Sequence, residues 1–137
     1  MYFDKHFNGR TYQWVNIYNE NDNLNKSITF KSFGSNSSFN CLATDCIAEP
    51  HVTGANQCLP LYRYDKEENR INNITDWGLE QFQTHYNDNK ITKEDIFHYT
   101  YAVLHNSTYR TKYELNLKRE FPHLSFYDDF HKWVSWG

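Results

Sequence analysis

The first half of the chain alternates short apolar and aromatic runs with polar stretches. Residues 12–18 hold aromatic and β-branched side chains in imperfect alternation, and residues 27–33 alternate more cleanly, as strands do. The polar segment 19–26 between them suits a hairpin or a longer loop, and the Gly-Ser-Asn-rich segment 34–38 ends the second run. The pattern therefore predicts a small β-rich unit in this half.

The second half repeats its apolar residues at intervals of three and four, as amphipathic helices do. Thr75 or Asp76 can cap a first helix, which the polar cluster 87–89 ends. A second helix begins after Thr92, which stands three residues before Asp95 in a spacing close to a capping box. The apolar faces of these two helices are predicted to hold Leu79, Phe82, Tyr86, Ile96, Tyr99, Val103 and Leu104.

Two further helical stretches follow. Asn106 breaks the second helix, and Ser107 is the predicted cap of a third, which Pro122 ends. The third helix would carry Tyr109, Tyr113, Leu117 and Phe121. A last amphipathic stretch runs to the C-terminus with Phe126, Phe130, Trp133 and Val134.

This order of elements predicts an α+β fold, with a small β-rich N-terminal half followed by a helical C-terminal half. A chain of 137 residues is long enough for one domain and short for two. We expect a single domain over 1–137, with the β-rich part at 1–64 and the helical part at 65–137. The chain ends in Trp-Gly without a polar tail, so we expect it to be a fragment of a longer polypeptide.

Composition and charge limit the kind of core, the partners and the cellular location expected for this domain. Aromatic residues make up 18% of the chain, which suits a compact core that reaches the surface at many points. The net charge of −3 provides no overall positive field that would attract nucleic acid to a free-standing protein. No apolar run approaches the roughly 20 residues of a membrane helix, and no secretory signal begins the chain. Three cysteines, an odd number, fit reduced thiols, so we expect a cytoplasmic location.

Candidate catalytic residues are few. Asp128 and Asp129 with Lys132 resemble scattered nuclease carboxylates, but the acid-x-Lys pair expected on an adjacent strand is missing. The two aspartates more simply serve the start of the last helix, where the helix dipole favours negative charge. The sequence also lacks a Gly-rich phosphate loop, His-Glu-x-x-His and Gly-x-Ser-x-Gly. We therefore predict no catalytic residue in this chain.

Metal-ligating residue types are present without a metal-site spacing. Cys41, Cys46, His51 and Cys58 could be arranged as four ligands, but their spacing matches no common zinc pattern. A pair of histidines seven residues apart on the second helix would lie about 10 Å apart along its axis, too far for one zinc ion. We expect buried thiols and helix-face histidines, and no metal.

Two groups of residues have the chemistry of nucleic-acid contact. Basic residues on the third predicted helix could contact phosphates, which fixes register without reading sequence; these are Arg110, Lys112, Lys118 and Arg119. The loop 51–57 gathers hydrogen-bonding side chains around a glycine, and Asn and Gln can bind adenine edges; its candidates are His51, Thr53, Asn56 and Gln57. A solvated helix face and an ordinary polar loop explain the same residues, so these alternatives stay open.

Blocks of residues in a fixed order carry a family resemblance. They are His-Val-Thr-Gly at 51–54, Gln-Cys-Leu-Pro-Leu-Tyr at 57–62, Asn-Ile-Thr-Asp-Trp at 73–77, Ile-Thr-Lys-Glu-Asp-Ile-Phe-His-Tyr at 91–99, Tyr-Ala-Val-Leu-His at 101–105, Tyr-Arg at 109–110, Leu-Asn-Leu-Lys-Arg-Glu-Phe-Pro at 115–122 and Phe-Tyr-Asp-Asp-Phe at 126–130. With them, residues 51–137 resemble the C-terminal specificity (target-recognition) region of type ISP single-polypeptide restriction-modification enzymes. A looser form over 91–122 is similar to the target-recognition region of adenine methyltransferase-nucleases. The Pro-His-Leu-Ser-Phe run at 122–126 departs from the Arg-Ile-Pro that such proteins often have.

The resemblance implies a DNA-binding specificity module, a non-catalytic fragment of a target-recognition domain. The nuclease, helicase-like ATPase and methyltransferase would be other domains of the parent, as would the sites for S-adenosylmethionine, ATP and Mg²⁺. The implied partners are double-stranded DNA and the methyltransferase and coupler domains, with no membrane. An alternative is a protein-protein docking or coupling module of the same enzyme, without direct base reading.

Overall fold

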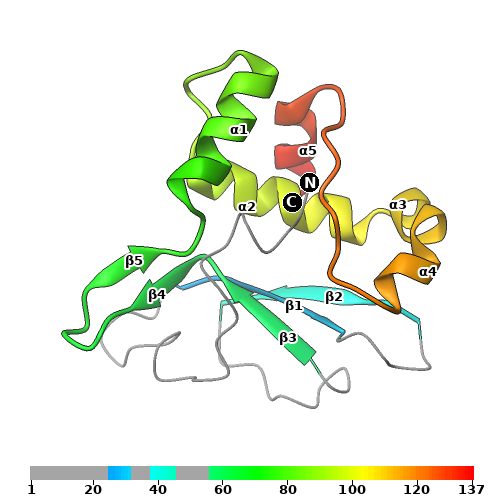
Figure 1. Ribbon diagram of the computed structural model, residues 1–137, viewed down its shortest axis with the longest axis horizontal. Coiled ribbons are helices and arrows are strands. Elements are labelled where there is room, and N and C mark those ends of the chain that lie inside the picture. Colours follow the sequence, from blue (N-terminus) through cyan, green and yellow to red (C-terminus); the bar gives the residue numbers. More distant parts are fainter. Residues whose placement is uncertain (1–24, 32–37, 46–55) are drawn as a thin grey trace.

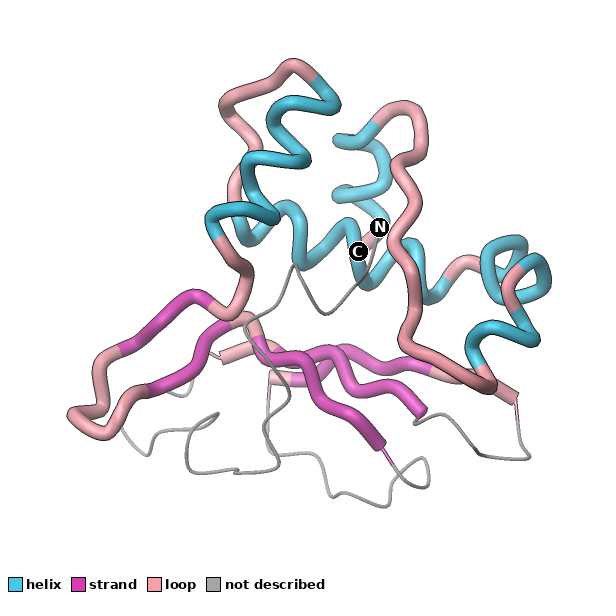
Figure 2. The backbone as a smooth tube through the Cα atoms, viewed as in Figure 1, coloured by secondary structure: helices cyan, strands magenta, loops and turns pink. Residues whose placement is uncertain are grey.

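The computed structural model describes residues 25–31, 38–45 and 56–137, in which helices lie over one side of a small sheet (Figure 1). A separate two-stranded hairpin extends from the edge of this arrangement (Figure 2). The predicted α+β class, with strands in the first half and helices in the second, is confirmed. Within the described residues, no helix has the length and apolar character needed to cross a membrane.

The larger sheet consists of three antiparallel strands. They are β1 (Ser27–Lys31), β2 (Cys41–Thr44) and β3 (Asn56–Pro60), in the order β2-β1-β3. Strand β1 confirms the strand predicted from residue 27 and is buried on both faces, as the central position requires. The strand predicted at 12–18 lies outside the described residues.

Side-chain alternation along β1 decides which residues face the helices. Ile28 lies opposite Leu59, and Phe30 lies opposite Cys41 and Gln57, so these side chains share one face. Phe30 packs edge-on against Phe121, which lies in the segment before the last helix, with 6.1 Å between the ring centroids. This face of the sheet therefore forms the floor of the hydrophobic core.

The hairpin consists of β4 (Tyr62–Tyr64) and β5 (Arg70–Asn72). Strand structure therefore continues past residue 64, where the sequence placed the start of the helical part, and that part begins only at Asp76. The prediction missed β5 because a three-residue strand beside the polar stretch 65–69 has too little apolar alternation to be recognised.

The first two helices follow the predicted signals closely. Helix α1 (Asp76–Tyr86) has Thr75 as its N-cap, with Thr75 Oγ1 accepting a hydrogen bond from Gly78 N at 2.9 Å. Its end lies at Asn87, which adopts the left-handed conformation at φ 50°. Helix α2 (Lys93–His105) begins with the complete capping box between Thr92 and Asp95. Local hydrogen bonding alone determines these helix ends, so they could be predicted from sequence.

The third predicted helix is two short ones, α3 (Ser107–Lys112) and α4 (Glu114–Leu117). The prediction of Ser107 as the cap is wrong: Asn106 Oδ1 accepts from Tyr109 N at 3.0 Å, which makes Asn106 the N-cap of α3. Tyr113 separates the two helices with φ −109° and ψ 20°. The helical stretch that Pro122 was predicted to end therefore ends at Leu117, and Phe121, predicted on the third helix, lies outside it.

A segment without regular secondary structure, residues 118–129, connects α4 to the last helix α5 (Phe130–Trp136). Tyrosine hydroxyls hold it: Tyr109 donates to His123 O at 2.9 Å, and Tyr99 donates to Ser125 O at 2.7 Å. Both acceptors lie within residues 122–126. Phe126, predicted in the last helix, lies in this segment instead and packs against Phe82 with 5.0 Å between ring centroids.

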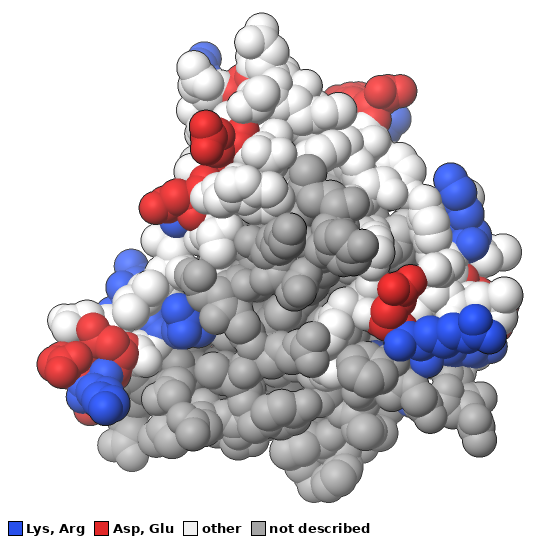
Figure 3. All heavy atoms as spheres, viewed as in Figure 1, with Lys and Arg blue, Asp and Glu red and all other residues white. Residues whose placement is uncertain are grey.

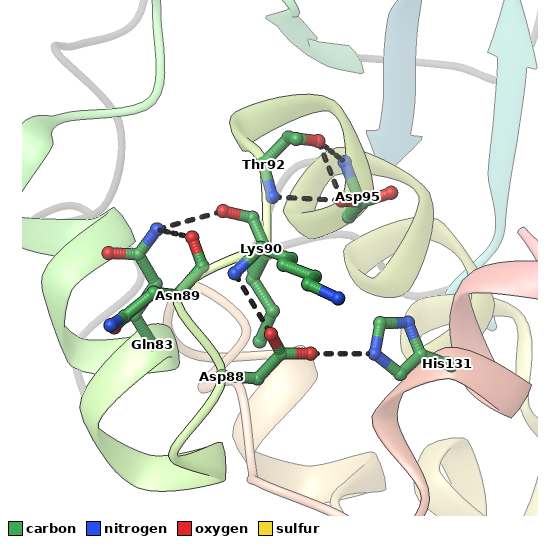
Figure 4. A network of polar contacts seen from close by, with 8 residues as sticks. Gln83, Asp88, Asn89, Lys90, Thr92, Asp95 and His131 are labelled. Atoms are coloured by element: carbon green, nitrogen blue, oxygen red, sulfur yellow. Dashed lines mark hydrogen bonds and ion pairs between the residues drawn. The ribbon is translucent and has the colours of Figure 1, made fainter.

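The turn between α1 and α2 is tied to α5 by polar contacts (Figure 4). Asp88 Oδ1 accepts a hydrogen bond from Lys90 N, and Asp88 Oδ2 lies 2.9 Å from His131 Nε2. Gln83 Nε2 donates to Ile91 O at 2.9 Å and so closes the turn from the α1 side. The three helices α1, α2 and α5 therefore form one unit above the sheet.

Candidate nucleic-acid interface

The four basic residues predicted to contact phosphate have different environments. Arg110 lies on α3, where its Nε donates to Leu104 O at 2.7 Å and its Nη2 lies 3.3 Å from Cys41 Sγ. Its guanidinium also lies 5.9 Å from the ring centroid of Phe39. Burial raises the pKa of the Cys41 thiol, although Arg110 acts in the opposite direction. Arg110 therefore connects the end of α2 to β2, a structural role that the sequence did not reveal.

The other three residues face outward, and we call Lys112, Lys118 and Arg119 the α3–α4 basic surface. Lys112 and Arg119 are exposed, and Lys118 Nζ lies 2.7 Å from Glu114 Oε1, one helical turn away. In Figure 3, basic side chains gather on the right of the molecule, where α3 and α4 lie in Figure 1. Such lysines and arginines can bind phosphates, with Lys118 exchanging its partner for one.

The predicted base-reading loop is only partly described. His51 and Thr53 lie outside the described residues. Asn56 is the first residue of β3, opposite Lys31, and Gln57 is the second. Gln57 was expected on a surface loop but is 6% exposed, because it pairs with β1 and faces the core beside Phe30. Its predicted contact with adenine stays a prediction, which requires its side chain to leave the core.

Two of the cysteines considered as zinc ligands, Cys41 and Cys58, lie on opposite faces of the sheet. Cys41 is opposite Phe30 and Cys58 is opposite Thr29, and neighbouring residues of a strand point to opposite sides. Cys46 and His51 lie outside the described residues. The part of the chain that the structure describes contains no group of three His, Cys, Asp or Glu side chains placed to hold a metal ion.

The carboxylates considered for catalysis lie at the start of α5. Asp128 and Asp129 are exposed, and Asp129 is the N-cap residue of the helix, where negative charge is favourable. Asp129 adopts the left-handed conformation at φ 59° and makes no capping bond with its side chain. Lys132 lies over the ring of Trp136, with its Nζ 5.2 Å from the centroid.

One exposed element escaped the sequence analysis, the β4–β5 hairpin with its turn at residues 65–69. All residues from Lys66 to Asn72 are exposed, and side chains of both signs meet there, on the left in Figure 3. The signal that could have found it is the polar run Asp-Lys-Glu-Glu-Asn after the alternating Tyr-Arg-Tyr, which is typical of a hairpin turn.

Comparison with known proteins places this arrangement in a family. The model of the Type ISP C-terminal specificity domain matches residues 1–137. The chain belongs to this family. A comparison with curated proteins gave no match.

Solved structures support the Type ISP assignment. The DrdV-DNA complex, determined by cryo-EM, contains a segment 45% identical to this chain, with a TM-score of 0.87 over 90% of the chain. A nuclease-deletion mutant of the Type ISP restriction-modification enzyme LlaGI, in complex with a DNA substrate mimic, is 25% identical over 88% of the chain with a TM-score of 0.68. The ATP-dependent Type ISP enzyme LlaBIII bound to DNA, at 22% identity over 92% of the chain and a TM-score of 0.74, supports the fold alone.

The chains of these three solved structures are much longer than this specificity domain. The matched segment covers 12% of the DrdV chain, 10% of the LlaGI chain and 9% of the LlaBIII chain. This chain thus spans about a tenth of the length of the solved chains that it matches. The family predicted from the sequence blocks is confirmed.

Proposed function

We propose that this chain is the DNA-binding sequence-specificity module of a Type ISP restriction-modification enzyme. The observation that carries the proposal is the similarity to the DrdV segment, which is 45% identical and was solved in a complex with DNA. Adenine methylation and ATP-dependent cleavage would be performed by other domains of the same polypeptide. The enzyme would work on DNA in the cytoplasm.

The α3–α4 basic surface supports this function. Lys112 is exposed at the end of α3, Arg119 is exposed just after the end of α4, and Lys118 adds a third positive charge next to Arg119. Contacts from such residues to phosphates would position the module on the duplex. Because the chain as a whole carries a net charge of −3, this local surface, rather than the overall field, would have to attract the DNA.

We propose that the module has no catalytic residue of its own. The candidate carboxylates Asp128 and Asp129 are exposed, directly before the first residue of α5. We propose that S-adenosylmethionine, ATP and Mg²⁺ bind to other domains, with which this module would make contact. The methyltransferase and coupler domains are the proposed protein partners.

A second candidate function is docking onto those domains, without base reading. A hollow of about 290 Å³ between α2 and α5 supports it, lined by Tyr101, His105, Trp133 and Trp136 among others. Trp136 is 58% exposed, so an apolar partner could pack against it. The other exposed large apolar side chains lie on four different elements, and scattered residues of this kind do not form a docking patch.

The decisive experiment exchanges specificity. The matching segment of DrdV would replace this chain in the full-length protein, and the methylated adenines of genomic DNA would be mapped. We expect the methylated sites to change to those of DrdV. Selection of bound duplexes from a randomised library would read the preference of the same chimera, even if it methylates poorly. An unchanged preference in both measurements would contradict the DNA-reading function and favour docking.

A further inference from the structure

We propose that the β4–β5 hairpin enters the major groove of DNA and that Arg70 reads a base pair there. The inference rests on the proposed function and names the element that provides its specificity. The hairpin is distinct from the α3–α4 basic surface and from the loop 51–57 suggested by the sequence.

The hairpin has the shape of a groove-reading element. Its two strands form a sheet of their own, and in Figures 1 and 2 they extend sideways beyond both the helices and the larger sheet. All three residues of β5 are exposed, including Ile71 at 39%, so the outer strand adds little to the core. A two-stranded ribbon fits the B-DNA major groove, which is about 12 Å wide.

The base of the hairpin is held rigidly by two asparagines that are 0% exposed. Asn25 Nδ2 donates to Tyr62 O at 2.9 Å, and Tyr62 N donates to Asn25 Oδ1 at 3.1 Å. On the returning strand, Asn73 Nδ2 donates to Pro60 O at 3.0 Å and Asn73 N donates to Leu61 O at 2.9 Å. An element fixed in this way loses little conformational entropy when it binds.

The tip is also fixed by its own hydrogen bonds. Asp65 Oδ1 accepts from Glu67 N at 2.9 Å and from Asn69 N at 2.8 Å, while Asp65 Oδ2 accepts from Asn69 Nδ2 at 3.0 Å. Glu68 completes the turn in the left-handed region at φ 63°. The hydrogen bond from the Asn69 side chain lowers the pKa of Asp65 most, and the bonds from the backbone N–H groups of Asn69 and Glu67 lower it further. The turn is therefore ordered before any partner binds.

Arg70 has the chemistry and the position of a base-reading residue. Its guanidinium lies 4.4 Å from the ring centroid of Tyr62, which limits its orientations, and the residue is exposed. A guanidinium can donate two parallel hydrogen bonds to O6 and N7 of guanine, the commonest specific contact in the major groove. Asn72, two residues away on the same side of β5, has an amide of the kind that binds adenine.

The charge of the hairpin suits base reading and does not suit general attraction to phosphates. Between residues 62 and 72 it has three basic residues and three acidic ones, so its net charge is zero. Inserting it into a groove adds no overall attraction to phosphates, whereas the α3–α4 basic surface does. Substitutions in the hairpin should therefore change which duplex is preferred, and substitutions on the α3–α4 basic surface should change how strongly all duplexes bind.

Two matched substitutions test this division. Arg70→Lys on the hairpin and Arg119→Lys on the α3–α4 basic surface make the same change and keep the charge, but lysine cannot reproduce a bidentate contact. Each full-length variant would select duplexes from a library with a randomised core, and circular dichroism would confirm its fold. We expect Arg70→Lys to lose discrimination at one base pair by about 10-fold or more, and Arg119→Lys to keep the wild-type preference.

The possible results distinguish this inference from the proposed function. If Arg70→Lys selects the same sequence as the wild type, the hairpin does not read bases, although the chain still recognises DNA. Equal weakening on every duplex would make Arg70 a phosphate contact and would also overturn the inference. A wild-type protein that selects no sequence at all would overturn the proposed function and this inference together.

Discussion

The hydroxyl of Tyr99, in the middle of α2, donates a hydrogen bond of 2.7 Å to Ser125 O and accepts one of 2.9 Å from Tyr127 N. Tyr99 is 0% exposed, so water cannot replace either bond. Burial and the neighbouring Tyr86 hydroxyl raise the pKa of Tyr99, which therefore stays neutral and keeps its proton to donate. The Tyr99 side chain thus helps to hold residues 118–129, the segment that leads to α5.

Tyr99→Phe should lower the free energy of unfolding by about 1–3 kcal/mol, because it leaves two partly buried backbone groups, Ser125 O and Tyr127 N, without this partner. Urea denaturation would measure this loss. Tyr101→Phe is the matched control on the same helix, where the side chain is partly exposed, and we expect a change below about 0.5 kcal/mol. Equal effects of the two substitutions would contradict the role given to the Tyr99 hydroxyl.

Arg110→Ala should destabilise the fold as well as alter DNA binding. The substitution removes the donor to Leu104 O and the contact with Cys41, and we expect a loss of about 1–3 kcal/mol in thermal or urea unfolding. Lys112→Ala, on the same short helix but exposed, should leave the stability within about 0.5 kcal/mol. If both variants are as stable as the wild type, the guanidinium has no structural role.

Lys112→Ala and Arg119→Ala should each weaken the binding of every duplex to a similar degree. Loss of one phosphate contact is expected to reduce the slope of log affinity against log salt by about 1. Titrations of the full-length protein at several salt concentrations would measure it. Lys90→Ala is the control, since it removes one exposed positive charge in the α1–α2 turn. A slope that falls equally in the control would point to overall charge instead of a local surface.

Asp88 should make the stability depend on pH in the acid range. The hydrogen bond from Lys90 N and then the contact with His131 lower the pKa of Asp88. A lowered folded-state pKa means stabilisation that is complete above the unfolded value of about 4 and is lost as the pH falls through the folded value. The difference in unfolding free energy between wild type and Asp88→Asn should therefore shrink as the pH falls below about 4. A difference that does not vary with pH would contradict this coupling.

The parts of the fold that the sequence predicted depend on neighbouring residues alone. Thr92 and Asp95 form the expected capping box because both partners lie within one helical turn. Asn106 and Ser107 were confused because both residue types cap helices, and only the position of Tyr109 N decides between them.

The environment of the candidate site could not be predicted in this way. Gln57 lies among polar residues in the sequence, yet pairing with β1 turns it toward the core. Arg110 contacts Cys41, which lies 69 positions earlier in the chain, and no local sequence pattern predicts such a contact. Charge and spacing in the sequence identified the four basic residues on and after these short helices. Only the tertiary structure showed that Arg110 has a structural role and that the residues of the α3–α4 basic surface face outward.

The two buried asparagines at the base of the hairpin have a consequence for how such a module can change. Asn25 and Asn73 bind backbone carbonyl groups of Tyr62 and Pro60. Their hydrogen bonds therefore do not depend on which side chains the hairpin carries further out. New side chains along β5 would therefore leave the hydrogen bonds at the base of the hairpin and in its turn in place. A protein built this way could acquire a different target through a few substitutions while its core stays the same.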